Sequence, residues 1–280
     1  MSTREPRGTL LAIGGAEDKR GRQTVLRRFV EAAGGDAARL VVVPTASSMG
    51  TEIVEQYDRL FRAMGAADVV ALRPETRADA DRPALSAPIA NATGVFMSGG
   101  NQLKLSAVVT GTRFGDAIRA AYERGAAVGG TSAGASVIGE HMPAFGPGGS
   151  TPKQRMSQLA AGLGLLAGGI VDQHFQQRNR YGRLLYLVAQ SPSLLGIGVD
   201  EDTAAVITQG RHLEVAGRGT VTIVDGRRVR SNAYEAKGTR PLLVSGAVVH
   251  VLPAGARFDL ATRELAGFET GDTRLREVAE

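Results

Sequence analysis

The sequence predicts an α/β fold: a doubly wound, mostly parallel sheet followed by a β-rich C-terminal extension. Over the first two-thirds of the 280 residues, short apolar runs alternate with segments of helical spacing. Repeated strand–loop–helix units of this length build parallel sheets with helices on both faces. The apolar run Leu40–Pro44 shows no alternation, as expected of a strand buried on both faces. From about Ala204 onward, short strand-like runs replace the helices.

The elements of the α/β part are expected in a regular order. Each strand is a short apolar run that ends in glycine or in a polar cluster, and each helix has apolar residues at helical spacing. Gly65 is a plausible C-terminal cap for the second helix. The expected strands are Thr9–Ile13, Leu40–Pro44, Val69–Leu72, Gly94–Met97, Ala126–Gly129, the apolar start of Gly169–Phe175, and Leu195–Val199, and the expected helices are Val25–Ala33, Thr51–Met64 and Phe114–Arg124.

The C-terminal part reads as an extension packed on the same sheet. Its short strands are Ala204–Ile207, His212–Val215, Val221–Val224 and Ala247–Leu252. The dipeptide Asp225-Gly226 is a strong signal for a hairpin turn. We therefore expect one domain over residues 8–270, with the extension at about 205–270 and flexible tails at 1–7 and 271–280.

The composition excludes several classes of protein. Apolar residues make up 43% and charged residues 22%, which is ordinary for a soluble globular protein. No apolar run approaches the roughly 18 residues of a membrane span, and the polar N-terminus lacks a signal-peptide core. The net charge of +5 comes from scattered basic residues, so nucleic acid is not expected as a partner. We expect a cytoplasmic enzyme without membrane contact.

The chain contains no cysteine, which limits the bonds, metal sites and nucleophiles that it can form. It excludes disulfides, thiolate metal sites and a cysteine nucleophile. The doublet Gly14-Gly15 lacks the spacing of nucleotide-binding phosphate loops. We therefore expect neither a metal nor a cofactor. The role of Glu17 and Asp18, which follow this doublet, stays open between structure and substrate binding.

The most informative motif is Gly130-Thr131-Ser132-Ala133-Gly134, which follows the expected strand Ala126–Gly129. It has the G-x-S-x-G pattern of a nucleophile elbow, a sharp turn from strand to helix that exposes a serine hydroxyl. Glycines suit such a turn because it leaves no room for Cβ atoms. The pattern alone is weak among so many small residues. It gains weight because Gly14-Gly15, Pro44–Ser48 and Ser98–Gly100 also follow expected strands.

A serine nucleophile needs a base, and the chain has four histidines. His212 and His250 lie on strands of the extension, where structural roles are favoured. His141 is expected near the far end of the helix after the elbow, away from the Ser132 hydroxyl. His174 follows an apolar strand and begins a polar cluster, so it is the preferred base, with a structural role as the alternative.

The acid that orients the base should come from another strand end. Leu195–Val199 delivers Asp200, Glu201 and Asp202. Alternation places the first and third of these opposite the second, which leaves Glu201 slightly ahead. A solvated acidic turn is the alternative.

These blocks together resemble the cyanophycinase family. The similar blocks are Gly14–Lys19, Ser98–Gln102, Gly130–Ala135, Gly162–Leu166 and Asp172–Leu184, which occur in the family's order over about residues 10–210. The arginine-dense block after His174 makes the resemblance specific. It implies a flavodoxin-like, class-I-glutaminase-like sheet and a serine peptidase that releases β-Asp-Arg dipeptides from cyanophycin, a poly-aspartate with arginine on each β-carboxyl. It also suggests a homodimer.

Carried over to this chain, the resemblance implies that Ser132 is the nucleophile, His174 the general base and Glu201 the orienting acid. The N–H groups of Ala133 and of Gly99 or Gly100 are candidates for the oxyanion hole. The remaining polar residues near these blocks suit a substrate that presents carboxylates and guanidinium groups. The candidate substrate-binding residues are Gln102, Lys153, Asp172, Gln173, Arg178, Arg180 and Arg183.

Two other functions remain open on the sequence. A peptidase-E-type dipeptidase that cleaves short aspartyl or isoaspartyl peptides would share the elbow and the fold. A non-catalytic binding protein could use the same fold, although an intact Ser, His and Glu set disfavours it.

Overall fold

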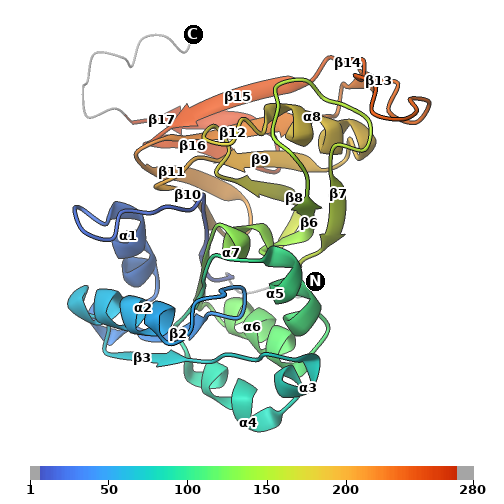
Figure 1. Cartoon of the computed structure of the whole chain (residues 1–280). Coiled ribbons are helices and arrows are strands. Elements are labelled where there is room, and N and C mark those ends of the chain that lie inside the picture. The colour runs from blue at the N-terminus through green and yellow to red at the C-terminus, as the bar shows by residue number, and fades with distance from the viewer. Residues whose placement is uncertain (1–6, 270–280) are drawn as a thin grey trace, which may run out of the picture.

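The computed structural model describes residues 7–269 of the chain (Figure 1). Two β-sheets lie at its centre and helices pack on their faces. None of the helices in this range has the length and apolar character that a membrane crossing requires. The tails expected at the two ends fall outside the described residues, apart from Arg7.

The first sheet is parallel in one half and antiparallel in the other. Its parallel strands are β1 (Leu10–Ile13), β5 (Ala127–Thr131), β4 (Gly94–Met97), β2 (Arg39–Val43) and β3 (Asp68–Ala71), in that spatial order. Beyond β1 the sheet continues antiparallel with β10 (Thr203–Thr208), β11 (His212–Gly217), β16 (Ala256–Asp259) and β17 (Glu264–Phe268). The carboxyl ends of the parallel strands share one edge.

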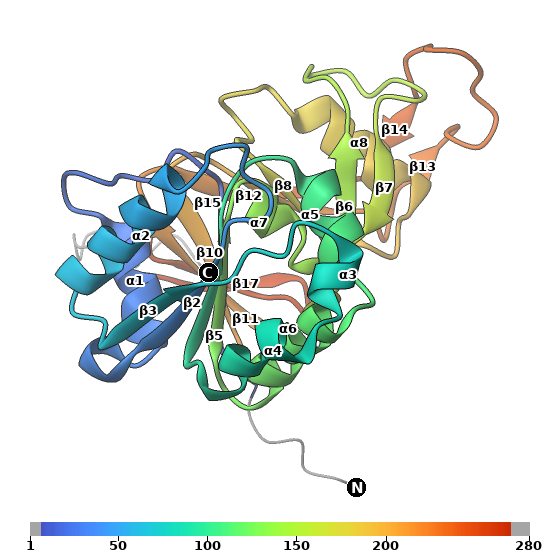
Figure 2. The ribbon, with the colours of Figure 1, turned by 60° about the horizontal axis from the view of Figure 1, so that its bottom comes forward.

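Helices cover the parallel half on both faces, as Figure 2 shows. On one face lie α1 (Thr24–Ala32) and α2 (Glu52–Ala63), and on the other α3 (Arg77–Ala80), α4 (Pro83–Ser86), α5 (Gln102–Val109) and α6 (Arg113–Glu123). The short 3₁₀ turn η1 (Gly35–Ala37) leads from α1 into β2, and η2 (Ala87–Asn91) leads from α4 into β4. Alternate residues of one strand enter different cores: Leu10 packs with the α5 and α6 side, and Leu11 with the α1 and α2 side. Two-sided burial explains the unbroken apolar strands.

The second sheet has the spatial order β15, β12, β9, β8, β6, β7. Its strands are β6 (Gly139–Phe145), β7 (Gln158–Ala161), β8 (Leu166–Gln173), β9 (Leu195–Val199), β12 (Thr220–Asp225) and β15 (Val248–Pro253). Strands β6, β8 and β9 run parallel, and the other three pair antiparallel. The helix α8 (Tyr181–Gln190) packs on this sheet, and β13 (Arg230–Ser231) pairs with β14 (Val244–Ser245) beside it.

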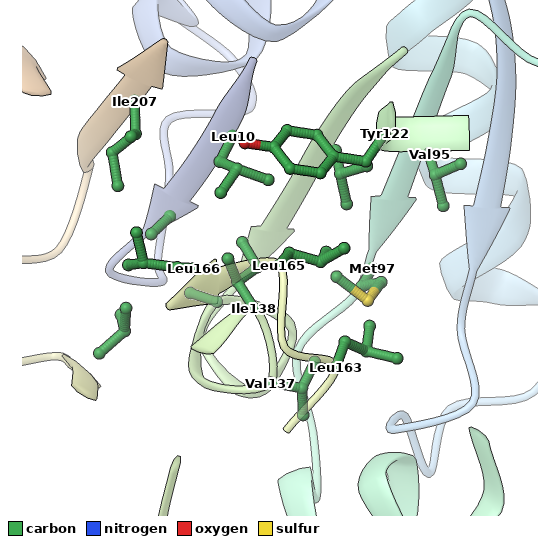
Figure 3. Close-up of a cluster of buried hydrophobic side chains, with 14 of the residues drawn as sticks. Leu10, Val95, Met97, Tyr122, Val137, Ile138, Leu163, Leu165, Leu166 and Ile207 are labelled. Atoms are coloured by element: carbon green, nitrogen blue, oxygen red, sulfur yellow. The ribbon is translucent and has the colours of Figure 1, made fainter. Parts of the chain in front are cut away.

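One apolar cluster joins the two sheets. Figure 3 shows Leu10 and Val95 of the first sheet with Leu165 and Leu166, which belong to β8 and the turn before it. Burial of such side chains contributes about 1.5–3 kcal/mol each. The two sheets therefore share a core, and this core fixes the carboxyl ends of β5 and β8 relative to each other.

The predicted α/β class and the β-rich extension are confirmed, but three local expectations are wrong. The extension does not pack on one sheet, because β12 and β15 join the second sheet while β10 and β11 continue the first. The turn at Asp225-Gly226 forms no hairpin between neighbouring strands: β12 pairs with β9 and β15, and the chain makes an excursion before it returns.

The third error concerns the segment after the elbow. The helix there, α7 (Ala133–Ser136), is a single turn, and His141 lies on strand β6 rather than near the end of a long helix. The sequence explains this, because β-branched Val137 and Ile138, then Gly139 and Pro143, do not favour a helix. His141 pairs in register with Ile170 of β8 and Ala161 of β7.

Candidate active site

The elbow has the strained geometry that the motif predicts. Strand β5 ends at Thr131, Ser132 has φ 51° and ψ −110°, and α7 begins at the next residue. Both flanking glycines are needed, because a Cβ on Gly130 would lie 2.2 Å from the carbonyl oxygen of Gly134, and one on Gly134 2.2 Å from that of Met97. The Ser132 N–H donates to the Ile13 carbonyl of the neighbouring strand β1 at 2.9 Å.

His174 stands where β8 ends and reaches the serine. Its Nε2 lies 2.9 Å from the Ser132 Oγ. The backbone of His174 is in the left-handed region, with φ 45°, and its N–H donates to the Gly14 carbonyl at 2.8 Å. The ring packs directly over Gly15, where a Cβ would lie 2.3 Å from Cε1. The doublet after β1 therefore makes room for the imidazole.

Glu201 completes a chain of hydrogen bonds. Its Oε1 lies 2.7 Å from Nδ1 of His174. The two residues follow β8 and β9, which run parallel with Gln173 in register with Val199, so their side chains leave the same edge of the sheet. The Gln177 Oε1 accepts from the Glu201 N–H at 3.0 Å and holds the acidic turn against the segment after His174.

The two neighbouring carboxylates face elsewhere. Asp200 is buried and accepts from the N–H of Gln176 at 3.0 Å and from the hydroxyl of Thr220 at 2.8 Å. Asp202 accepts from the N–H of Asp18 at 2.8 Å. Asp200 and Asp202 therefore bind the backbone of neighbouring segments. Of the three acidic residues, only Glu201 contacts the imidazole.

The imidazole is poised as a neutral base. Burial lowers the pKa of His174 below its ordinary value of 6.5, the hydrogen bond and charge of Glu201 oppose this, and the positive charges of Arg178 and Arg180 add to the lowering. Glu201 accepts from Nδ1–H, which leaves the Nε2 lone pair for the serine hydroxyl. This arrangement is the one that serine hydrolases use to activate their nucleophile.

The loop after β4 and the start of α7 meet at the nucleophile. A Cβ on Gly99 would lie 3.4 Å from the Ser132 Cβ, so this loop passes beside the serine. Gly100 has φ 140° and packs against the loop after β2, where a Cβ would lie 2.0 Å from the Ala46 carbonyl oxygen. Ala133 opens α7 next to the nucleophile. All three sequence candidates for the oxyanion hole therefore lie in the two segments that meet at Ser132.

The expected substrate contacts divide into buried and exposed residues. Asp172 is fully buried, and its two oxygens accept from Arg183, with Nε at 2.6 Å and with Nη2. Arg183 is 1% exposed and also donates to the Gly146 carbonyl at 2.8 Å. Asp172 and Arg183 already have partners inside the protein, which argues against a direct contact of either with substrate.

Arg180 and Gln173 belong to the same buried cluster as Asp172 and Arg183. The Arg180 Nη1 donates to the main-chain oxygen of Gln173 at 2.5 Å, to its side-chain oxygen at 2.6 Å and to Asp172 at 3.3 Å. Burial lowers the pKa of Arg180 to about 10, which leaves it charged at neutral pH. Because Gln173 directly precedes His174, these hydrogen bonds hold the backbone next to the base. The same hydrogen bonds occupy Arg180 and the side-chain oxygen of Gln173, which limits the contact that either residue can make with a substrate.

The other three candidates lie closer to solvent. Arg178 is exposed, and its N–H donates to the His174 carbonyl at 3.0 Å. Gln102 is half-buried, and its Nε2 donates to the carbonyls of Pro143 and Ala144, each at 3.2 Å. Lys153 is exposed in the loop between β6 and β7.

Lys153 also lines a cavity of about 480 Å³. Its walls come from the loop of residues 147–156, with Asn179 and Thr239. This loop is attached to the segment after His174, since the Gly149 N–H donates to the Asn179 carbonyl at 2.5 Å and the Gly182 N–H donates to the Gly149 carbonyl at 2.7 Å. The cavity wall carries two cations, Lys153 and Arg155, and no carboxylate among the residues that line it.

Sequence reasoning did not assign two contributors to this site. Gly15 makes space for the imidazole, and Gln177 holds the backbone of Glu201. The glycine doublet at the end of a strand was a signal for Gly15, since glycine at such a position often allows another group to approach the backbone closely. No local signal distinguishes the second, because its partner lies on another strand.

Comparisons with known proteins identify the family of this chain. The model of peptidase family S51 matches residues 10–215. A protein of Geminocystis herdmanii named cyanophycinase is 39% identical over 260 residues, which cover 92% of this chain and 96% of that protein. A cyanophycinase of a Nostoc species is 41% identical over 268 residues, covering 94% of this chain and 90% of that one.

A solved structure shares the fold. The crystal structure of a peptidase from an acI-B1 Actinobacterium superposes with a TM-score of 0.63 at 22% identity, over 88% of this chain and 98% of that one. Ser132, His174 and Glu201 all fall within the range that the family model matches. Since that range and the curated relatives cover most of this chain, the protein belongs to peptidase family S51.

Proposed function

We propose that this protein is a cyanophycinase, a serine-type peptidase that hydrolyses multi-L-arginyl-poly-L-aspartate to β-Asp-Arg dipeptides. The observation that carries the proposal is the hydrogen-bonded series from Ser132 Oγ through His174 to Glu201. It occurs in a chain about 40% identical, over more than nine-tenths of its length, to proteins that are named cyanophycinase.

The chemistry follows from the geometry at the strand ends. His174 Nε2 accepts the proton of Ser132 as Oγ attacks the peptide carbonyl of the aspartate backbone. Glu201 stabilises the imidazolium that forms, and the Ala133 N–H with that of Gly99 or Gly100 stabilises the oxyanion. Each such donor typically lowers the activation barrier by about 3–4 kcal/mol.

The same groups complete the turnover. His174 returns its proton to the leaving amine, the C–N bond breaks and an acyl-enzyme remains on Ser132. A water molecule, deprotonated by His174, then attacks the ester and releases the acid, and Ser132 regains its proton. Because every proton passes through Nε2, the ring orientation that Glu201 fixes is used twice in each cycle.

Exposed cationic side chains near the active site suit a polymeric substrate that carries free carboxylates. In cyanophycin each arginine keeps its α-carboxylate, so the chain presents an anionic group at every unit. We propose that Arg178 beside the base contacts the unit being cleaved, and that Lys153 on the cavity wall contacts a neighbouring unit. The half-buried Gln102 is proposed to add a neutral hydrogen bond.

The decisive experiment incubates purified cyanophycin with the protein and with its Ser132→Ala variant. We expect β-Asp-Arg from the first and none from the second, together with labelling of Ser132 by a serine-directed phosphonate in the unmodified protein. Hydrolysis of short aspartyl or isoaspartyl peptides with none of the polymer would instead identify a peptidase-E-type dipeptidase. Absence of both hydrolysis and labelling would identify a binding protein.

We propose a cytoplasmic homodimer that uses neither nucleic acid nor membrane as a partner. Light scattering coupled to gel filtration measures the mass in solution, and cell fractionation locates the protein.

A further inference from the structure

Glu17, whose role the sequence left open, is buried beside the elbow. The residue is 4% exposed, so a substrate in the active site does not reach its carboxylate. Instead its oxygens accept from two hydroxyl groups: Tyr57 on α2 at 2.6 Å and Thr131 at 2.5 Å. The Lys19 Nζ lies 2.8 Å from Oε1 and closes the cluster toward solvent.

This cluster needs a charged carboxylate. Burial raises the pKa of Glu17, but the charge of Lys19 and the hydrogen bonds from Lys19, Thr131 and Tyr57 outweigh it, so the pKa lies below its ordinary value. Two hydroxyl donors and an ammonium all require an acceptor, and an ionised carboxylate offers about four lone-pair sites. An amide in the same place offers one acceptor oxygen and places N–H groups against other donors.

The position of Thr131 connects the cluster to catalysis. Thr131 is the last residue of β5 and directly precedes Ser132, whose φ of 51° is held by its surroundings. Strained backbone of this kind persists only where neighbouring contacts over-determine it. The side-chain hydrogen bond from Thr131 to Glu17 is one such contact, alongside the main-chain bond from Ser132 to Ile13.

The loop that carries Glu17 also supports the other two members of the site. Its Gly14 carbonyl accepts from the His174 N–H, and its Gly15 carbonyl accepts from the N–H of Asp202, next to Glu201. The loop after β1 therefore contacts all three catalytic segments. Glu17 is the side chain that attaches this loop to the residue before the nucleophile.

Resting on the serine-hydrolase function proposed above, we infer that Glu17 is a positioning residue: it fixes the loop after β1 against Thr131 and thereby sets the Ser132 hydroxyl relative to His174. Its contribution acts on the chemical step and not on substrate binding. A misplacement of about 1 Å in such a site lowers the rate about 100-fold.

The test compares Glu17→Gln with Thr131→Val, Thr131→Ser and a matched control. We expect Glu17→Gln and Thr131→Val to lower kcat for cyanophycin about 10- to 100-fold with little change in KM, and Thr131→Ser, which keeps the hydroxyl, to stay near the unmodified rate. The rate of phosphonate labelling of Ser132 should fall in parallel. The acid limb of the pH profile should move little, because the largest influences on the pKa of His174 are its burial, Glu201, Arg178 and Arg180.

Asp225→Asn is the control for loss of a buried, ion-paired carboxylate. Asp225 is 4% exposed and pairs with Arg227 at 2.7 Å and Arg263 at 2.6 Å, away from the elbow. We expect it to lower the melting temperature without lowering kcat. A kcat loss equal in Glu17→Gln and Asp225→Asn, or a rise in KM alone in Glu17→Gln, would overturn the inference.

The labelling readout separates this inference from the substrate assignment. Phosphonate labelling reports the reactivity of Ser132 whether or not cyanophycin is the substrate. A normal labelling rate in folded Glu17→Gln would overturn the positioning role, whereas slow labelling in a protein that does not cleave the polymer would contradict only the substrate. If Glu17→Gln does not fold, the Thr131→Val and Thr131→Ser pair decides the question alone.

Discussion

Gly15 and His174 are complementary in shape: a Cβ on Gly15 would lie 2.3 Å from Cε1 of the imidazole and 2.5 Å from Nε2. Real Cβ atoms do not approach other atoms so closely, so any side chain here displaces the ring. The displaced atom would be Nε2, the one that lies 2.9 Å from the Ser132 Oγ. A glycine two residues beyond the end of β1 thus sets the geometry of the proposed proton transfer.

Gly15→Ala should therefore lower kcat about 100-fold or more, because the imidazole must rotate or shift away from Ser132. Gly15 also has φ +98°, where alanine is strained, so the variant should lose some stability as well. Gly65→Ala separates the two effects. Gly65 has φ +100°, and no atom lies within 4 Å of the place that an alanine methyl group would occupy, so this variant carries the same strain without the clash. Equal kcat values for the two alanine variants would refute the steric argument.

Glu201→Gln should lower kcat about 10⁴-fold while substrate binding stays similar. The amide can occupy the same place, 2.7 Å from Nδ1, but its N–H group favours the wrong tautomer and it does not stabilise an imidazolium. Steady-state kinetics on cyanophycin measure the effect. Asp202→Asn is the control, since asparagine keeps an oxygen for the Asp18 N–H and Asp202 makes no contact with the ring. A comparable loss in Asp202→Asn would remove the special role of Glu201.

Much of this architecture is predictable because it is local. The expected bounds of Gly94–Met97 and Leu195–Val199 match β4 and β9, since apolar runs between turn residues define a strand without help from the rest of the fold. The order of the motifs also placed Ser132, His174 and Glu201 at strand ends, where the structure brings them within hydrogen-bond distance.

The remainder depends on contacts between distant segments. The division into two sheets, with Ser132 from the first and His174 from the second, follows from pairing that no local pattern encodes. Arginines and aspartates are usually exposed, so the sequence favoured substrate contacts for Asp172 and Arg183, whereas their mutual pairing allows both to be buried. The role of Glu17 was open for the same reason, because its partner Tyr57 lies on α2.

The pH dependence should reflect the lowered pKa of His174. The base must be neutral to accept the proton of Ser132, so the acid limb of kcat/KM should have an apparent pKa below 6.5. Arg178→Ala removes a positive charge that lowers this pKa, so the limb should move to higher pH. Arg178→Lys keeps the charge and should leave the limb nearly in place. A shift to lower pH in Arg178→Ala would contradict this account of the charges around the imidazole.

Asp172→Asn should destabilise the protein strongly. Asp172 pairs in the interior with Arg183 through both oxygens and with Arg180 through one. Removal of its charge leaves two buried guanidinium groups uncompensated, which costs about 3–5 kcal/mol. Denaturant titration measures the free energy of unfolding. Arg178→Ala, on the exposed surface of the same block, should change it by less than about 0.5 kcal/mol.

The double variant Asp172→Asn with Arg183→Met tests the physical cause of that loss. It removes the charge of Arg183 along with that of Asp172 and leaves only Arg180 without its carboxylate. Part of the lost stability should therefore return, because uncompensated charge and not the missing hydrogen bonds carries most of the penalty. If Asp172→Asn instead left stability unchanged and raised KM for cyanophycin, Asp172 would be a substrate ligand after all. The burial of both side chains argues for the first outcome, since a substrate that reached this carboxylate would have to displace Arg183 from it.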